Sequence, residues 1–347
     1  MLMRFDYLVF IGRFQPVHRG QLSILRRALE ESRNVIVLIG SANRPRNIRN
    51  PWTAAERTVM LRSALSAASE RVRFAPLRDH LYNENAWVGV VQSTVARLIA
   101  EDGFPGDARI GLISGDDEAS AEYLQAFPQW PRVEVPHTDT LSSTELRQHY
   151  FSGDAGGRHL LEANAPPAVF EMIEAFRTGS PAYAGLVEEF RFVQQYRKGW
   201  ESAPYPPTFV TVDAVVVHSG HVLLVKRGAQ PGLGLWALPG GFVRHNESIP
   251  NAVLRELREE TRLKIPAPVL RGSIKACEVF DHPNRSLRGR TITHAFHFEF
   301  PTGALPAVKG GDDAAKARWF TLAEVRQLEE HMYEDHFYIV EHFIGSA

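Results

Sequence analysis

The sequence predicts an α/β protein in two parts, a doubly wound parallel sheet followed by an α+β unit with a mixed sheet. In the first half, apolar segments of strand length alternate with helical patterns, which is typical of parallel sheets. In the second half, alternating strands and a hairpin signal predominate. Three prolines between 204 and 207 break the chain between the two patterns. We therefore expect domains at 1–180 and 207–347, joined by a helical linker at 181–206.

The composition is that of an ordinary globular protein. Hydrophobic residues make up 44% and charged residues 23% of the 347 residues, and the formal net charge is −1. This balance gives no support to nucleic-acid binding through bulk charge. We expect no membrane association, because no apolar stretch approaches the roughly 18 residues that a span needs. The single cysteine, Cys277, excludes an internal disulfide and fits a reducing cytoplasm. The sequence leaves the oligomeric state open, a homo-oligomer included.

The first expected strand, 7–11, runs into a glycine-containing loop and then a helix at 22–32. Backbone N–H groups and the dipole at a helix start make such a loop a ready phosphate site. His18 lies at its mouth, although a lone histidine is more often structural. The loop reads Gly12-Arg13-Phe14-Gln15-Pro16-Val17-His18-Arg19-Gly20-Gln21, and it resembles the Gly-x-Phe-x-Pro-x-His-x-Gly-His signature of nucleotidyltransferases.

This resemblance implies that Gly12, Arg13, Phe14 and His18 bind ATP, and that His18 stabilises the transition state. Gln21 stands where the family has its second histidine. Its amide can donate a hydrogen bond to a phosphate oxygen, but it carries no positive charge. The first half is therefore either an adenylyl transferase, slower for this change, or a nucleotide-binding module without activity.

A second segment of interest lies between strands expected at 35–40 and 72–77. Asn50-Pro51-Trp52-Thr53 precedes a helix expected at 54–68, and Thr53 with Glu56 has the capping-box pattern that starts many helices. The segment also resembles one in archaeal-type nicotinamide mononucleotide (NMN) adenylyltransferases. That resemblance implies that Asn50 and Trp52 belong to the substrate site.

The loop after the strand at 72–77 carries three more candidates, Asp79, Asn83 and Trp87. In the same family an aspartate, an asparagine and a tryptophan here bind the nicotinamide amide and stack on its ring. The residue types suit a ligand that needs one acceptor, one donor and an aromatic face. A core aromatic on a helix is the competing interpretation of Trp87.

A strand at 109–114 is followed by a helix expected between Gly115 and Phe127, and then by Leu141-Ser142-Ser143-Thr144-Glu145-Leu146-Arg147. This string resembles the Ile-Ser-Ser-Thr-x-x-Arg signature of nucleotidyltransferases. The resemblance implies that Ser142, Ser143, Thr144 and Arg147 grip the ATP phosphates, while a capping box from Ser142 to Glu145 is the structural alternative. The two signatures imply a Rossmann-like domain in which the NMN phosphate attacks ATP to give NAD and pyrophosphate.

The second half begins after helices expected at 167–177 and 184–198. Strands at 209–217 and 221–226 surround Ser219-Gly220 and predict a hairpin. Further strands are expected at 272–280, 291–300 and 317–322. Between them lies a glycine pair, Gly240-Gly241, followed by a helical run that ends near Arg262.

Three glutamates share one face of this helix, because residues three and four apart are neighbours. Glu256, Glu259 and Glu260 would repel one another, and a hard divalent cation between them removes the penalty. Glu247 on the preceding loop can reach the same cation. A solvated charged helix face is the alternative.

The frame from Gly241 through Glu247 to Arg255-Glu256-Leu257-Arg258-Glu259-Glu260 resembles the Nudix box. It departs from that box at Arg262, where the family has glycine. The resemblance implies that Glu256, Glu259 and Glu260 bind Mg²⁺ or Mn²⁺, that Glu247 assists, and that Arg255 holds the carboxylates through Glu259. Gly240 and Gly241 would lie against the substrate. The metal lowers the pKa of a bound water, which then attacks a diphosphate.

Arginines at 285, 288 and 290 lie between the two long strands. Arg285 and Arg288 either contact phosphate or ribose, or belong to a solvated hairpin tip. The two halves together resemble bifunctional NMN adenylyltransferase/Nudix hydrolase proteins, which implies ATP, NMN and ADP-ribose as substrates. The alternative for the second half is a nucleotide sensor, although all three box glutamates are present.

Overall fold

The structure is a computed structural model that describes residues 3–104, 106–115, 125–136 and 141–345. The chain divides into two compact units, Met1–Val187 and Glu188–Ala347. This division falls within one helix, α8 (Pro181–Lys198). The domain limits of 180 and 207 remain predictions.

The first unit is built on a five-stranded parallel sheet with the order β3-β2-β1-β4-β5. Its strands and helices before α8 are β1 (Phe5–Gly12), α1 (Arg19–Glu31), β2 (Ser32–Ile39), α2 (Ala54–Leu65), the 3₁₀ helix η1 (Ser66–Arg71), β3 (Val72–Pro76), α3 (Glu84–Glu101), β4 (Ile110–Gly115), β5 (Arg132–Val135), α5 (Ser143–Ser152), α6 (Ala155–Asn164) and α7 (Pro167–Gly179).

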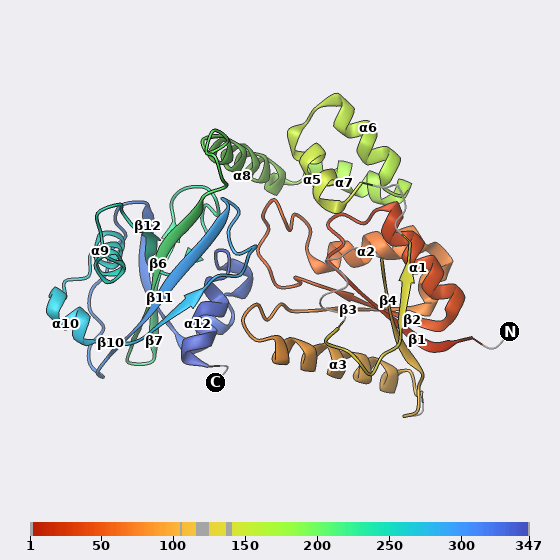
Figure 1. Ribbon diagram of the computed structural model, residues 1–347, viewed down its shortest axis with the longest axis horizontal. Coiled ribbons are helices and arrows are strands. Elements are labelled where there is room, and N and C mark those ends of the chain that lie inside the picture. The colour runs from red at the N-terminus through yellow and green to blue at the C-terminus, as the bar shows by residue number, and fades with distance from the viewer. Residues whose placement is uncertain (1–2, 105, 116–124, 137–140, 346–347) are drawn as a thin grey trace. The chain divides into compact units, whose positions relative to one another are not determined.

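Helices cover both faces of this sheet (Figure 1). On one face, α3 packs Val91, Val95 and Leu98 against Tyr7 and Val9 of β1. On the other face lie α1 and α2, as in Figure 1. The strand order reverses direction at β1, and this is where the carboxyl ends of parallel strands form a ligand crevice. The expected doubly wound parallel sheet is confirmed.

The second unit contains the expected mixed sheet. Its main path is β10-β11-β6-β7-β12, in which β11 and β6 are parallel and the other neighbours are antiparallel. Its elements after α8 are β6 (Thr208–His218), β7 (His221–Arg227), β8 (Trp236–Ala237), β9 (Gly240–Phe242), α9 (Ile249–Thr261), α10 (Ala267–Gly272), β10 (Ile274–Phe280), β11 (Arg290–Phe300), β12 (Ala314–Thr321), α11 (Leu322–Arg326), the 3₁₀ helix η2 (Glu329–His331) and α12 (His336–Ile344).

The core of the second unit lies between this sheet and α9. Val253, Leu254 and Leu257 of α9 pack with Val212 of β6 and Phe298 of β11, and all of them are buried. The spacing of the three leucine and valine side chains therefore fixes which face of α9 turns inward. It also fixes which glutamates of α9 turn toward β9.

Most expected elements are present, with different ends. Helix α1 begins at Arg19 rather than at 22, and α2 ends at Leu65 before a 3₁₀ helix. The hairpin between β6 and β7 is confirmed. Strand β5 and helix α6 were not predicted. The helix expected between Gly115 and Phe127 lies mostly outside the described residues.

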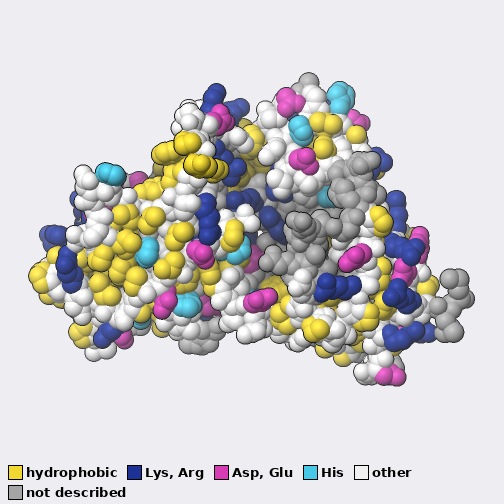
Figure 2. Space-filling view, in the orientation of Figure 1, with side chains coloured by type: hydrophobic (Ala, Val, Ile, Leu, Met, Phe, Trp, Pro, Cys, Tyr) yellow, Lys and Arg dark blue, Asp and Glu magenta, His cyan; other side chains and the backbone are white. Residues whose placement is uncertain are grey.

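No helix within the described part of the chain is long and apolar enough to cross a membrane. Lys and Arg side chains are interspersed with Asp and Glu side chains over the visible surface of each unit (Figure 2), in keeping with the formal net charge of −1.

Candidate active sites

The loop after β1 is shaped by one close contact. A Cβ atom on Gly12 would lie 2.9 Å from the ring of Phe14, and Phe14 itself has a φ of +53°. Only glycine fits at position 12 without moving that ring. The N–H of Gly40, after β2, donates to the carbonyl of Gly12 at 2.8 Å, so the ends of β1 and β2 stay together.

His18 is the residue before the first turn of α1. The side-chain oxygen of Gln21 accepts a hydrogen bond from the backbone N–H of His18 at 3.3 Å. The amide oxygen of Gln21 therefore caps the helix, and its NH₂ group is the end that can donate to a ligand.

The structure brings the two nucleotidyltransferase signatures together. Arg147, in the first turns of α5, donates to the carbonyl of Gln15 at 2.6 Å and to the hydroxyl of Thr144 at 3.1 Å. The Ser143 hydroxyl donates to the carbonyl of Pro16 at 3.2 Å. The Ser142 side chain instead caps α5 in the expected box with Glu145. These contacts join segments about 130 residues apart.

Two buried arginines, Arg57 and Arg147, lie near this junction. Burial, followed by repulsion from Arg13 and Arg49, lowers the pKa of Arg147 to about 9. Burial and then Arg13 likewise lower the pKa of Arg57 to about 10. A polyphosphate would relieve such crowded positive charge, and guanidinium groups match phosphate oxygens well. Arg49 and Arg57 were not among the predicted site residues.

The segment around Trp52 packs against the loop that follows β1 and holds it in place. The Trp52 side chain is only 2% exposed and packs against Tyr150 and Phe176. Its backbone N–H and carbonyl both pair with the side chain of Gln15, at 3.1 and 2.8 Å. The structure therefore places the Trp52 ring in the core, where it positions the loop rather than meeting solvent. The Asn50 side chain accepts a hydrogen bond from Arg13 at 2.8 Å.

The three nicotinamide candidates lie after β3, in the loop before α3 and in the first turn of that helix. Asp79 accepts hydrogen bonds from the backbone and hydroxyl of Ser41, both at 3.2 Å. Asn83 caps α3 by accepting from the N–H of Ala86. The half-buried Trp87 ring meets Phe127 edge to face at 5.7 Å. Each therefore also has a structural contact, and their ligand roles stay predictions.

In the second unit, Arg255 gathers the acidic side chains. It donates to both carboxylate oxygens of Glu247, at 2.9 and 2.8 Å, to Glu256 at 2.6 Å and to Glu259 at 3.1 Å. The hydrogen bonds from Arg255 hold the pKa of Glu247 below its usual range. The predicted contact between Arg255 and Glu259 is present.

The glycine pair lies directly against α9. A Cβ atom on Gly241 would come within 2.6 Å of a Glu256 carboxylate oxygen, and one on Gly240 would collide with the carbonyl of Val212. The N–H of Gly240 donates to Glu260 at 2.9 Å. Strand β9 thus presents backbone rather than side chains to the glutamates.

The donor set fits a hard divalent cation. Glu256 and Glu260 are buried, and burial raises the pKa of both carboxyls. For Glu260 it reaches about 9, with neighbouring Asp313 as a further cause. Buried negative charge of this kind needs a cation or a proton. Among the described residues no three acidic, histidine or cysteine side chains already converge as a metal site, and Arg255 lies among three of the glutamates.

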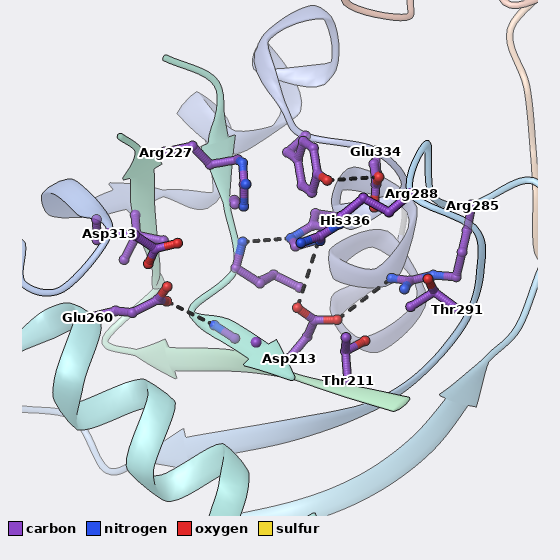
Figure 3. A pocket seen from close by; sticks show the side chains of 17 residues that line it. Thr211, Asp213, Arg227, Glu260, Arg285, Arg288, Thr291, Asp313, Glu334 and His336 are labelled. Atoms are coloured by element: carbon purple, nitrogen blue, oxygen red, sulfur yellow. Dashed lines mark hydrogen bonds and ion pairs between the residues drawn. The ribbon is translucent and has the colours of Figure 1, made fainter. Parts of the chain in front are cut away.

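A pocket adjoins Gly240, Gly241 and Glu260 (Figure 3). Most of the side chains that line it were not predicted as site residues, among them Asp213, Arg227, Asp313, Tyr333 and His336. The sequence does contain a signal for Asp213, because a single carboxylate interrupts the otherwise apolar strand from 212 to 217. The others lie in segments without a distinctive pattern.

The interpretation of 281–290 as a solvated hairpin tip is wrong for Arg285. This side chain is 4% exposed and pairs with both carboxylate oxygens of Asp335, at 2.8 and 2.9 Å. Arg285 also lines the pocket, so its contact with phosphate or ribose stays a prediction. The Arg288 guanidinium lies 4.7 Å from the ring centre of Phe242 and lines the pocket.

Arg262 ends α9 with a φ of +52°, a left-handed conformation that favours glycine. We expect Arg262→Gly to raise the free energy of unfolding by about 1 kcal/mol, because that conformation strains other residues. Denaturant unfolding measures the change. Exposed Lys264, which has no positive φ, is the matched control, and Lys264→Gly should bring no gain. A less stable Arg262→Gly would mean that packing of its guanidinium on Gly311 outweighs the strain.

Comparisons with known proteins agree with both units. A family model for the NUDIX domain matches residues 207–343, and a Cytidylyltransferase-like model matches residues 9–149. The nicotinamide/nicotinic acid mononucleotide adenylyltransferase of Acinetobacter baylyi is 35% identical over 192 residues, which are 55% of this chain and 96% of that protein. The ADP-ribose pyrophosphatase of Methanocaldococcus jannaschii is 38% identical over 119 residues, which are 34% of this chain and 65% of that protein.

In one unit the two nucleotidyltransferase signatures are in contact, and in the other the glutamates of the Nudix box lie against β9. This combination defines a class of two-domain enzymes that act on nucleotides. A solved structure extends the likeness to the whole chain. It is a bifunctional NMN adenylyltransferase/ADP-ribose pyrophosphatase from Francisella tularensis, complexed with AMP and a manganese ion. It matches with a TM-score of 0.90 and 34% identity over 98% of both chains. The chain therefore belongs to the family of bifunctional NMN adenylyltransferase/ADP-ribose pyrophosphatases.

Proposed function

We propose that the first unit forms NAD and pyrophosphate from ATP and NMN, and that the second unit hydrolyses ADP-ribose to AMP and ribose 5-phosphate. The observation that supports the first activity best is the meeting of the two signatures through Arg147 and Gln15. For the second it is the position of the box glutamates against Gly240 and Gly241.

In the first unit an oxygen of the NMN phosphate attacks the α-phosphorus of ATP, and the bond to the bridging β-phosphate oxygen breaks. The nucleophile is already an anion, so the protein mainly positions the reactants and neutralises charge. Arg147 and Arg13 would face the phosphates, with His18 and the NH₂ group of Gln21 at the helix start. Asp79, Asn83 and Trp87 would bind the nicotinamide.

In the second unit Glu256, Glu259 and Glu260 would hold Mg²⁺ or Mn²⁺. Such a cation neutralises the diphosphate and lowers the pKa of a water molecule that attacks phosphorus. The protein orients the ligands, because Arg255 fixes Glu247, Glu256 and Glu259, and the N–H of Gly240 fixes Glu260. Arg288 and Arg227, which line the adjoining pocket, would face the rest of the substrate.

Two incubations of the full-length protein test this proposal. One contains ATP, NMN and Mg²⁺, and the other ADP-ribose and Mg²⁺, each with a chelator control. We expect NAD in the first and AMP in the second, and neither with chelator. Absence of NAD would make the first unit a binding module. Intact ADP-ribose would make the second unit a sensor.

A substitution at Gln21 distinguishes the helix-capping role of its amide oxygen from the proposed phosphate-binding role of its NH₂ group. Gln21→Glu keeps an oxygen that caps α1 but replaces the NH₂ donor with negative charge facing the proposed phosphates. We expect the rate of NAD formation to fall about 100-fold, as for the loss of one donor to a transition state. Steady-state kinetics measure it, with ADP-ribose hydrolysis as the internal control. An unchanged rate would show that Gln21 only caps the helix.

A further inference from the structure

The segment before β9 is held by a side chain from the C-terminal helix α12. The backbone N–H of Leu238 donates to Nδ1 of His336, the first residue of α12, at 2.9 Å (Figure 3). Pro239 follows and has no N–H, while its carbonyl accepts from the N–H of Ala214 at 2.8 Å. These two hydrogen bonds fix the chain immediately before Gly240.

The orientation of the His336 ring follows from this bond. Because Nδ1 accepts a hydrogen bond, the neutral ring carries its proton on Nε2. Nε2 faces a carboxylate oxygen of Asp213 at 3.8 Å. The imidazole is 6% exposed and packs edge to face on Tyr333. One nitrogen therefore holds the backbone, while the other points at a buried negative charge.

Asp213 is in turn held in place. It accepts a hydrogen bond from the Thr293 hydroxyl at 2.6 Å, and Arg285 lies 3.7 Å away. Arg285 pairs with Asp335, the residue next to His336. His336, Asp213, Arg285 and Asp335 thus form a buried circuit, which we call the Asp213 circuit; Figure 3 shows the first three of them. Asp213 lies on β6 and is the register partner of Gly240 on β9. The circuit is therefore connected to β9 through β6.

We propose that His336 is a positioning residue for the glutamate site: through Leu238 it sets the place from which the N–H of Gly240 holds Glu260. This inference rests on the proposed metal-dependent function of the second unit. His336 contacts the backbone two residues before the donor, and Gly240 contacts the carboxylate directly. Groups that orient metal ligands in this way commonly change metal affinity by 10- to 100-fold when they are lost.

Two amide substitutions test the contact with little change in polarity. In asparagine the amide oxygen is bonded to Cγ, as Nδ1 is in histidine, so His336→Asn can still accept from Leu238. In glutamine the amide is one bond further out, at the place of Nε2, so His336→Gln loses that acceptor. Mn²⁺ titration of the full-length protein, without nucleotide, measures the effect. Glu260→Gln defines the background.

We expect His336→Gln to bind Mn²⁺ at least about 10-fold more weakly than the wild type, and His336→Asn to remain within about threefold. Thermal unfolding would show that the second unit of both variants is folded, and NAD formation would show that the first unit is intact. Equal affinities in all three proteins, or an equal loss in both variants, would overturn the proposal. Wild-type protein that bound Mn²⁺ but left ADP-ribose intact would contradict the proposed hydrolysis instead, and the affinity comparison would still decide the role of His336.

Discussion

Replacing Glu260 with glutamine should reduce ADP-ribose hydrolysis about 1,000-fold and leave NAD formation unchanged. Glutamine keeps an oxygen that can accept from the N–H of Gly240, so the local backbone should be retained. What disappears is the negative charge that would hold the cation, and the cation contributes several kcal/mol to stabilising the transition state. Initial rates with saturating Mg²⁺ measure the loss.

The same variant should be at least as stable as the wild type. Glu260 is a buried carboxyl beside Asp313, and its pKa is raised to about 9 by burial. In the metal-free protein, an uncharged amide at this place removes the cost of protonating the buried carboxyl or of burying its charge. Glu278→Gln, on the exposed part of β10, is the matched control and should change neither quantity. Glu260→Gln that hydrolysed ADP-ribose at the wild-type rate would remove Glu260 from the metal site.

The sequence could predict what depends on local spacing. The capping boxes at Thr53 and Ser142 are present, because each joins residues three apart. The contact from Arg255 to Glu259 is present for the same reason, since it spans one helical turn. Strand β5 escaped prediction because it has only four residues and owes its place to pairing with β4. Its pairing is not a local property.

The contacts that sequence reasoning missed join distant segments of the chain. Arg285 lies in a polar stretch that is typical of a solvated loop, and it is buried because Asp335 meets it from 50 residues further along the chain. His336 reaches Leu238 across 98 residues. In neither pair does the local sequence around one residue indicate the other residue. Asp213 differs, because a carboxylate within an apolar strand is a local signal that a partner must come from elsewhere in the chain, although it does not identify that partner.

The buried ion pair between Arg285 and Asp335 should contribute strongly to the stability of the second unit. Arg285→Met should lower the free energy of unfolding of the second unit by about 3–5 kcal/mol, because it leaves the carboxylates of Asp335 and Asp213 without their cation. Methionine retains most of the apolar length of arginine, so the loss is one of charge rather than of packing. Denaturant unfolding, followed through residual ADP-ribose hydrolysis, reports on this unit.

Arg290→Met is the matched control, because Arg290 lies near Arg285 in the chain and pairs with the exposed carboxylate of Asp281. An exposed pair of this kind contributes only about 0–1 kcal/mol. NAD formation by the first unit should persist at denaturant concentrations at which Arg285→Met has lost hydrolysis. Equal small losses in both variants would show that the circuit around Asp213 adds little net stability. The circuit would then serve the placement of His336 alone.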